Sequence, residues 1–206
     1  DYRTLNNIHT IKVLVGRHQM EGDGVEFTAC YPGRDFPSVS VTGTYCEQMC
    51  AHCRGRHLSG MLPADVPGSI PRLVGHGGVL VSGGCDQEGV VPLAARVGEV
   101  AEASGKGLVN VHAGFSDRET IAALVRAGVH RFSVDVHQDP AVISDVLNLD
   151  RPPGDYAELL RTIRGEGGTA VPHLTIGFGD LDFTLSASMV ASMGFRHVVL
   201  LTLIPG

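Results

Sequence analysis

Six short runs of β-branched and apolar residues alternate with helical patterns from residue 38 to the end of the chain. We expect one helix between the first two runs, and others over 92–104, 117–127, 140–148, 155–165 and 184–193. This alternation predicts parallel strands joined by right-handed crossovers, either as an open doubly wound sheet or as a (β/α) barrel. The predicted strands are SVSVTGT (38–44), GVLVSGG (78–84), LVNVHAG (108–114), RFSVDVH (131–137), VPHLTIG (171–177) and HVVLLTLI (197–204).

Local signals mark the expected helix ends. Asp117 stands three residues before Thr120 and just ahead of an apolar helix face, which predicts an N-cap. Glycine tolerates the left-handed conformation in which many helices end. We therefore expect helices to stop near Gly105, Gly107, Gly128 and Gly194.

Residues 1–37 lie outside the alternation and form a separate lead-in. IKVLV (11–15) and VEFTACY (25–31) are predicted to pair as a hairpin around Gly22 and Gly24. We therefore divide the chain into a lead-in, 1–37, and a core, 38–206.

Within the predicted strands, one of the two faces is polar. An eight-stranded barrel normally fills its interior with Val, Ile and Leu, and a polar interior would leave buried groups unpaired unless something polar occupied it. The pattern thus favours a polar ligand at the carboxyl ends of the strands, whereas an antiparallel sheet with one wetted face is the plainer alternative. The polar positions are Ser38, Ser40, Thr42, Thr44, Asn110, His112, Ser133, Asp135, His137, His173 and Thr175.

The stretch TYCEQMCAHCRGRH (44–57) holds three of the chain's five cysteines in the spacing C-x3-C-x2-C. Cys46, Cys50 and Cys53 with His57 would complete a tetrahedral zinc site. The same three thiolates would also bind a [4Fe–4S] cluster and leave one iron open for a small ligand. Because the cysteines follow directly on the first strand and face the expected polar cavity, their location favours the iron–sulfur cluster.

Composition and charge exclude several classes of protein. The net charge is −6, so a basic footprint for nucleic acid or a membrane surface is absent. No apolar run is long enough to span a membrane, no signal peptide opens the chain, and an odd number of cysteines with three bunched together fits a reducing compartment. We expect a cytoplasmic protein. The chain begins at Asp1 and stops after an apolar run, so we also expect it to be an excerpt from a longer protein.

Phosphate-binding and dinucleotide motifs are absent from the expected positions. No G-x-G-x-x-G follows the first strand and no G-x-x-x-x-G-K-[ST] occurs in the chain. Nucleotide binding by these two loops is therefore not expected.

The cysteine spacing after the first strand of a β/α fold resembles the radical S-adenosylmethionine (SAM) enzymes. Ser82-Gly83-Gly84-Cys85-Asp86, at the end of the second strand, is similar to that family's Gly-Gly-Glu element, although only the glycine pair matches. HLTIG (173–177) loosely resembles the family's Gly-x-Ile-x-Gly, with His173 in place of the first glycine. The resemblance implies a partial TIM-type (β/α)6 barrel of parallel strands over 38–206.

The resemblance also implies roles for individual residues. Cys46, Cys50 and Cys53 would bind the [4Fe–4S] cluster, which cleaves SAM to a 5′-deoxyadenosyl radical. His52 would lie near the adenine, and the backbone of Ser82, Gly83 and Gly84 would receive the methionine amino group. The methionyl carboxylate or the ribose would contact Asn110, His112 and Asp135; His173 joins this cofactor-binding set and, with His137, is a candidate for substrate contact. Each of these polar residues has a plain alternative as a buried hydrogen-bonding group.

Four longer stretches of the sequence indicate one branch of this family. VSVTGTYCEQMCAHCRGRHLSGM, VSGGCDQEGVVPL, LVNVHAGF and VPHLTIGFG resemble the biotin-synthase-like branch that includes the archaeal-type, two-protein lipoyl synthases. This resemblance implies sulfur insertion into a protein-bound octanoyl chain, with an octanoylated carrier protein and a second synthase subunit as partners.

Sulfur insertion usually consumes an auxiliary iron–sulfur cluster, for which only Cys30 and Cys85 remain. Both are expected to be buried free thiols, so an auxiliary cluster would need ligands outside this segment. Three alternatives stay open: a rearrangement or C–C bond-forming reaction of the same branch, a zinc-stabilised metabolite-binding barrel without radical chemistry, and a non-catalytic scaffold for a second subunit.

Overall fold

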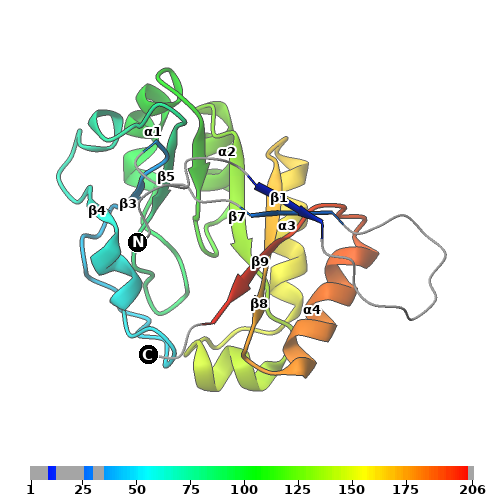
Figure 1. The fold of residues 1–206 in the computed structure, drawn as a ribbon. Helices are drawn as coiled ribbons and strands as arrows, with labels where there is room; N and C mark the ends of the chain where they lie inside the picture. The colour runs from blue at the N-terminus through cyan, green and yellow to red at the C-terminus, as the bar shows by residue number, and fades with distance from the viewer. Residues whose placement is uncertain (1–8, 13–25, 30–34, 204–206) are drawn as a thin grey trace.

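A seven-stranded parallel sheet forms the centre of the protein in a computed structural model that describes residues 9–12, 26–29 and 35–203 (Figure 1). The strand order is β4-β3-β5-β6-β7-β8-β9, and each neighbouring pair is parallel. The strands are β3 (Ser38–Ser40), β4 (Leu62–Pro63), β5 (Val79–Ser82), β6 (Val109–Val111), β7 (Arg131–Asp135), β8 (Ala170–Ile176) and β9 (Val199–Thr202).

This arrangement confirms the predicted α/β class and the partial barrel of parallel strands. Each of the six predicted runs contributes one strand, and the two-residue β4 is an addition that the sequence did not predict. The first strand is shorter than predicted, because residues 41–44 turn away after Ser40. The Thr42 hydroxyl stabilises that turn by donating a hydrogen bond of 2.8 Å to the carbonyl of Tyr45.

Helices connect successive strands and cover one side of the sheet (Figure 1). The expected helix after the cysteines is a single 3-10 helix, and the expected helix at 140–148 contracts to a π-helical turn. The longer helices are α1 (Val97–Ser104), α2 (Arg118–Arg126), α3 (Gly154–Gly165) and α4 (Asp180–Ser192); the short ones are η1 (Arg56–Gly60), η2 (Ile70–Arg72), η3 (Ala94–Arg96) and η4 (Val142–Val146).

Helix ends follow the predicted local rules. The Asp117 side chain accepts a hydrogen bond from the Thr120 amide at 2.8 Å, which confirms it as the N-cap of α2. Gly128 and Gly194 follow α2 and α4 with φ of 87° and 76°, in the left-handed region that favours glycine.

The apolar face of the sheet packs against the helices and forms the core. Val39, Val81, Val111 and Phe132 on adjacent strands are at most 1% exposed. Each such side chain contributes roughly 1.5–3 kcal/mol to folding through burial. The core therefore fixes which face of every strand turns away from the helices.

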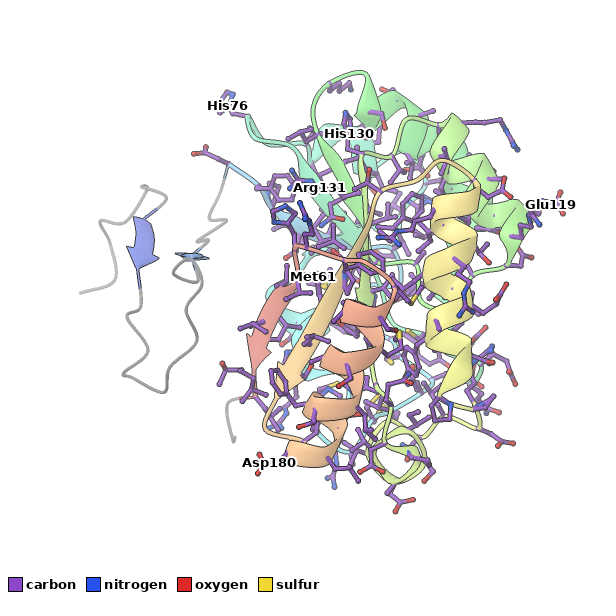
Figure 2. The ribbon with its side chains drawn as sticks, turned by 90° about the vertical axis from the view of Figure 1, so that its right-hand side faces the viewer. Met61, His76, Glu119, His130, Arg131 and Asp180 are labelled. Carbon is purple, nitrogen blue, oxygen red and sulfur yellow. The ribbon has the colours of Figure 1, made fainter. Side chains whose placement is uncertain are left out.

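The opposite face carries the polar residues. Paired residues in a parallel ladder share a face, and the register pairs Ser40 with Ser82 and Asp135 with His173. Figure 2 shows the two ends of this sheet: His130 and Arg131 lie where β7 begins, and Asp180 lies beyond the end of β8. The polar residues thus continue along this face to the carboxyl ends of the strands, where parallel β/α folds carry their functional sites.

In the lead-in, β1 (His9–Lys12) pairs antiparallel with β2 (Glu26–Ala29), and Ile11 lies opposite Phe27. The rest of the predicted hairpin, with Cys30, lies outside the described residues. The division of the chain at residue 37 stays a prediction. Within the described ranges, no helix combines the length and apolar character needed to cross a membrane.

Candidate functional site

A cavity of about 480 Å³ lies at the carboxyl ends of the strands. This volume is in the range of small-molecule sites. Its wall collects residues from almost every strand and from the loop after β3. The residues predicted for a site that line it are Cys46, Cys50, His52, Cys53, Ser82, Gly83, Gly84, His112, Asp135, His137 and His173.

The cysteine loop, residues 46–53, is held on one side by the end of β5. The carbonyl of Cys85 accepts hydrogen bonds from the amides of Glu47 and Gln48 at 2.9 and 3.2 Å. The Cys46 thiol lies 3.8 Å from the same carbonyl oxygen. The loop therefore turns its thiols into the cavity while its backbone rests on the segment that follows β5.

Gly84 is required for this close approach. A Cβ atom at Gly84 would lie 2.6 Å from the Cα of Cys46, and still closer to the carbonyl oxygen of Tyr45. A side chain at Gly84 would therefore displace the cysteine loop itself. In the described chain no residue donates a hydrogen bond to the carbonyl oxygens of Gly83 and Gly84, and both residues line the cavity.

The thiols influence one another's charge. The Cys50 thiol, and to a lesser extent His52, lower the pKa of Cys53 to about 4 although burial opposes the change. The neighbouring Cys53 thiol and then burial raise the pKa of Cys50 far above its ordinary value. These opposite shifts favour a thiolate on Cys53, and thiolate is the form that binds metal.

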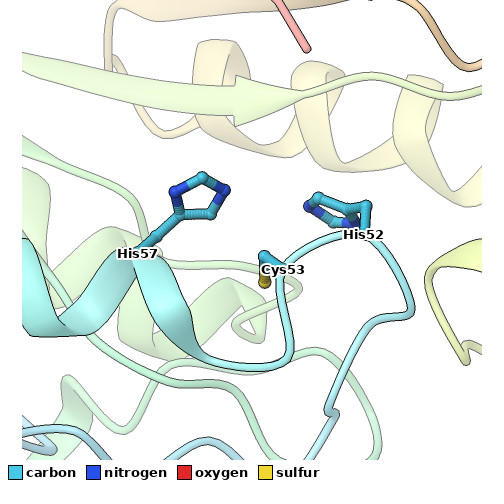
Figure 3. Close-up of side chains that lie close together, drawn as sticks. All are labelled: His52, Cys53 and His57. Carbon is cyan, nitrogen blue, oxygen red and sulfur yellow. The ribbon is translucent and has the colours of Figure 1, made fainter. Parts of the chain in front are cut away.

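His57 and His52 lie beside Cys53 (Figure 3). One ligand atom from each of the three residues lies within 4.8 Å of the other two. This group of three includes neither Cys46 nor Cys50, the other thiols of the predicted zinc set. A single zinc ion holds its ligands about 2.0–2.3 Å away, so its four ligand atoms must lie close together. The four predicted zinc ligands are not gathered in this way, whereas an iron–sulfur cluster is larger and binds more widely spaced thiols.

His112, Asp135 and His173 meet across three adjacent strands. His112 Nε2 lies 3.0 Å from Asp135 Oδ2, and His173 Nδ1 lies 3.3 Å from Oδ1. Burial alone would raise the pKa of Asp135, but His112 and then His173 hold it well below its usual range. Burial would lower the pKa of His112, but the Asp135 carboxylate raises it. The carboxylate is therefore ionised.

Two buried polar atoms in the cavity wall have no hydrogen-bond partner among the described residues: Asp135 Oδ1, which His173 approaches without hydrogen-bond geometry, and His52 Nδ1. Such atoms are rare in folded proteins and call for a partner. The cavity therefore presents an acceptor on the strands and a polar ring atom on the cysteine loop to any ligand that fills it.

Asn110 is not brought to the cavity. Its amide donates a hydrogen bond of 2.9 Å to the hydroxyl of Ser133 on the neighbouring strand. Asn110 lies two residues before His112 and on the same face of the sheet. The sequence therefore predicted its face correctly, but it did not predict that Asn110 lies outside the cavity wall.

His137 has a partner that the sequence did not reveal. Its Nδ1 lies 2.8 Å from Asp182 Oδ2, and Asp182 Oδ1 accepts the amides of Gln138 and Asp139. Burial opposes ionisation of Asp182, but these hydrogen bonds, His137 first, lower its pKa. Both side chains are at most 3% exposed, and His137 lines the cavity. Asp182 lies 45 residues further along, in the first turn of α4, and no local signal identifies it.

Cys85 also lines the cavity and is only partly buried, whereas the sequence predicted a buried thiol. Burial, and then the nearby Cys46, raise the pKa of Cys85 to about 12. Tyr156 of α3 adds a buried ring to the cavity wall. This ring packs edge-on against Phe115, with 4.9 Å between the two ring centroids. Neither residue was predicted as part of the site.

Comparison with solved structures identifies the fold. Methylornithine synthase (PylB) superposes with a TM-score of 0.62 at 16% identity over 82% of this chain and 53% of its own. A structure of anSMEcpe with bound AdoMet (SAM) and a Cp18Cys peptide gives 0.60 at 10% identity, over 82% of this chain and 51% of its own. A second anSMEcpe structure, with bound AdoMet alone, gives 0.58 at 9% identity, over 82% and 52%.

These similarities establish that the chain shares the fold of these proteins, and it spans about half the length of each of these structures. No family model matches the chain, and no curated protein matches it.

Proposed function

We propose that the chain is the core of a radical SAM enzyme, with Cys46, Cys50 and Cys53 as the ligands of a [4Fe–4S] cluster. The observation that carries this proposal is the meeting of the cysteine loop, the open carbonyls of Gly83 and Gly84, and ionised Asp135 in one cavity. The fold is one that binds AdoMet in anSMEcpe. One-electron cleavage of the SAM sulfonium to a 5′-deoxyadenosyl radical is the chemistry that such a cluster supplies when bound.

The residues of the chain bind and orient the ligand in this proposal. The carbonyls of Gly83 and Gly84 accept the methionine ammonium, and Ser82 borders the same end of β5. Asp135, held by His112 and His173, accepts hydrogen bonds from hydroxyl or ammonium groups of the ligand. His52 lies beside the adenine, and the cavity wall excludes water from the reacting centre. Residues 38–206 form this core, and residues 1–37 precede it as a separate lead-in.

The reaction we propose is sulfur insertion into a protein-bound octanoyl chain, as in the lipoyl synthases of the biotin-synthase-like branch. The proposal rests on the resemblance of the long stretches around the cysteines and the glycine pair. An apolar part of the cavity wall is compatible with an acyl chain: Leu80, Leu147, Leu149, Leu159 and Leu201 line it. A rearrangement or a C–C bond-forming reaction would use the same core.

Anaerobic reconstitution tests the first proposal. About four iron and four sulfide per chain, a brown absorbance that is lost in Cys50→Ala, and release of 5′-deoxyadenosine with SAM and dithionite are expected. A reconstituted protein that binds iron but releases no 5′-deoxyadenosine contradicts it. Incubation with SAM, reductant and an octanoylated peptide then tests the reaction, and an increase in peptide mass by added sulfur is the expected result.

The position of His57 and His52 beside Cys53 favours a second candidate, a zinc-stabilised metabolite-binding barrel. One zinc per chain without sulfide, retained in Cys46→Ala and lost in His57→Ala, would support it over the cluster. If the three cysteines are the ligands, the metal should instead be lost in Cys46→Ala and retained in His57→Ala.

A further inference from the structure

A second segment, far along the chain, also holds the cysteine loop by hydrogen bonds. Residues 146–148, which we call the clamp, begin with the last residue of the π-helical turn η4. The amide of Ala51 donates a hydrogen bond of 2.7 Å to the carbonyl of Val146, and the side-chain amide of Gln48 donates one of 2.8 Å to the carbonyl of Leu147. The cysteine loop is thus fixed between two segments rather than hanging from the end of β3.

Asn148 completes the clamp with its side chain. Its Nδ2 donates to the carbonyls of Gln48 at 3.1 Å and Met49 at 2.9 Å. Asn148 has φ of 54° and Met49 has φ of 48°, both in the left-handed region. Asparagine tolerates this conformation better than most residues, and for methionine it is strained. The side chain of Asn148 therefore holds the cysteine loop in a shape that the local sequence does not favour.

The clamp reaches one of the proposed cluster ligands directly. The Cys50 Sγ atom lies 3.4 Å from the carbonyl oxygen of Leu147, the same oxygen that accepts from Gln48. Gln48 is only 9% exposed, and Leu147 lines the cavity. A carbonyl dipole at this distance acts on the sulfur in a medium from which water is largely excluded.

We propose that Gln48 and Asn148 are positioning residues that fix Cys50 and set the reduction potential of the cluster that it binds. This inference rests on the proposed function, because it presupposes the cluster. Hydrogen bonds and dipoles around ligating sulfurs are among the features that tune cluster potentials. Gln48 draws electron density on the Leu147 oxygen away from Cys50. Without Gln48, the negative end of this dipole faces the sulfur undiminished, which stabilises the oxidised cluster and lowers the potential.

The test uses two substitutions and a matched control in the reconstituted protein. Gln48→Met removes one buried donor at nearly constant volume. Asn148→Gly removes both side-chain hydrogen bonds while it accommodates the positive φ. Gln87→Met makes the same chemical change as the first variant at an exposed position of the neighbouring loop. The measurements are the midpoint potential from an EPR-monitored redox titration and the rate at which an iron chelator removes the cluster.

We expect a lower midpoint potential in Gln48→Met and about tenfold faster loss of the cluster in Asn148→Gly, corresponding to two lost hydrogen bonds. Gln87→Met should match the unsubstituted protein in both measurements. If the two clamp variants also match it, the inference is overturned. Absence of the cluster from a clamp variant whose far-UV circular dichroism is unchanged supports the positioning role.

Failure of the proposed function gives a different result. If the unsubstituted protein binds no cluster, the radical SAM proposal itself is wrong. If Gln48→Met does not fold, Asn148→Gly still decides the inference, because glycine tolerates the positive φ and Asn148 is exposed.

Discussion

The two halves of the candidate site are built in different ways. Asp135 and His173 are paired on adjacent strands and His112 directly follows β6, so the ladder register and the buried apolar face fix their direction. The cysteine loop has no regular structure, and it takes its shape from the carbonyl of Cys85 and from the clamp. The strand half is thus rigid by its own pairing, whereas the loop half depends on contacts contributed by distant segments.

The contrast predicts that a single methyl group is enough to disrupt the loop half. Gly84→Ala should abolish iron binding after reconstitution, because its Cβ would displace the backbone of Tyr45 and Cys46. Gly98→Ala is the matched control, since a Cβ there meets nothing within 4 Å. Equal iron content in the two variants would show that the loop can move without loss of the cluster.

The buried His137–Asp182 pair, which belongs to neither half, should affect stability instead. Asp182→Ala should lower the free energy of unfolding by about 3–5 kcal/mol, because it leaves His137 and two backbone amides without their buried partner. Urea denaturation of the apoprotein measures this change. Asp182→Asn keeps one acceptor, so its free energy of unfolding should lie between those of the unsubstituted protein and Asp182→Ala. A loss under about 1 kcal/mol in Asp182→Ala would mean that water replaces the carboxylate.

Asp135→Asn sharpens the comparison because it should separate the halves. Removing this charge should weaken SAM binding by about tenfold or more and leave iron content unchanged, because in the described chain the cysteine loop donates no hydrogen bond to Asp135. Equilibrium binding of SAM to the reconstituted protein provides the measurement, with the exposed Asp145→Asn as control. Unchanged affinity would move Asp135 from the cofactor to the substrate or to the core.

The smallest expected effect is a pH dependence of the strand half. The pKa of His112 is raised, so its ion pair with Asp135 stabilises the fold below the unfolded-state pKa near 6.5 and is lost as the pH rises through the folded-state value. The low pKa of Asp135 keeps the carboxylate charged throughout this range. The difference in unfolding free energy between the apoprotein and His112→Gln should be roughly 0.5–1 kcal/mol at pH 6, after solvent screening, and should shrink toward pH 9. A difference that grows with pH would contradict the pairing.

The same division explains what could be predicted from the sequence. Alternation with period two placed His112, Asp135 and His173 on one face, and the side-chain chemistry of Asp117 placed a helix start. Nothing local indicates that Gln48 meets Leu147, that His137 meets Asp182, or that a two-residue strand pairs beside β3. These contacts depend on how distant segments pack, and a pattern read over ten residues contains no information about them.

The clamp also orders events during folding. The hydrogen bonds from Gln48 and Asn148 join residues 99 and 100 positions apart in the chain. During synthesis, the cysteines leave the ribosome long before the carbonyl and amide groups that shape their loop. The loop can reach its final form only after β7 and the turn behind it have folded, which makes the earliest motif in the core one of the last parts to mature.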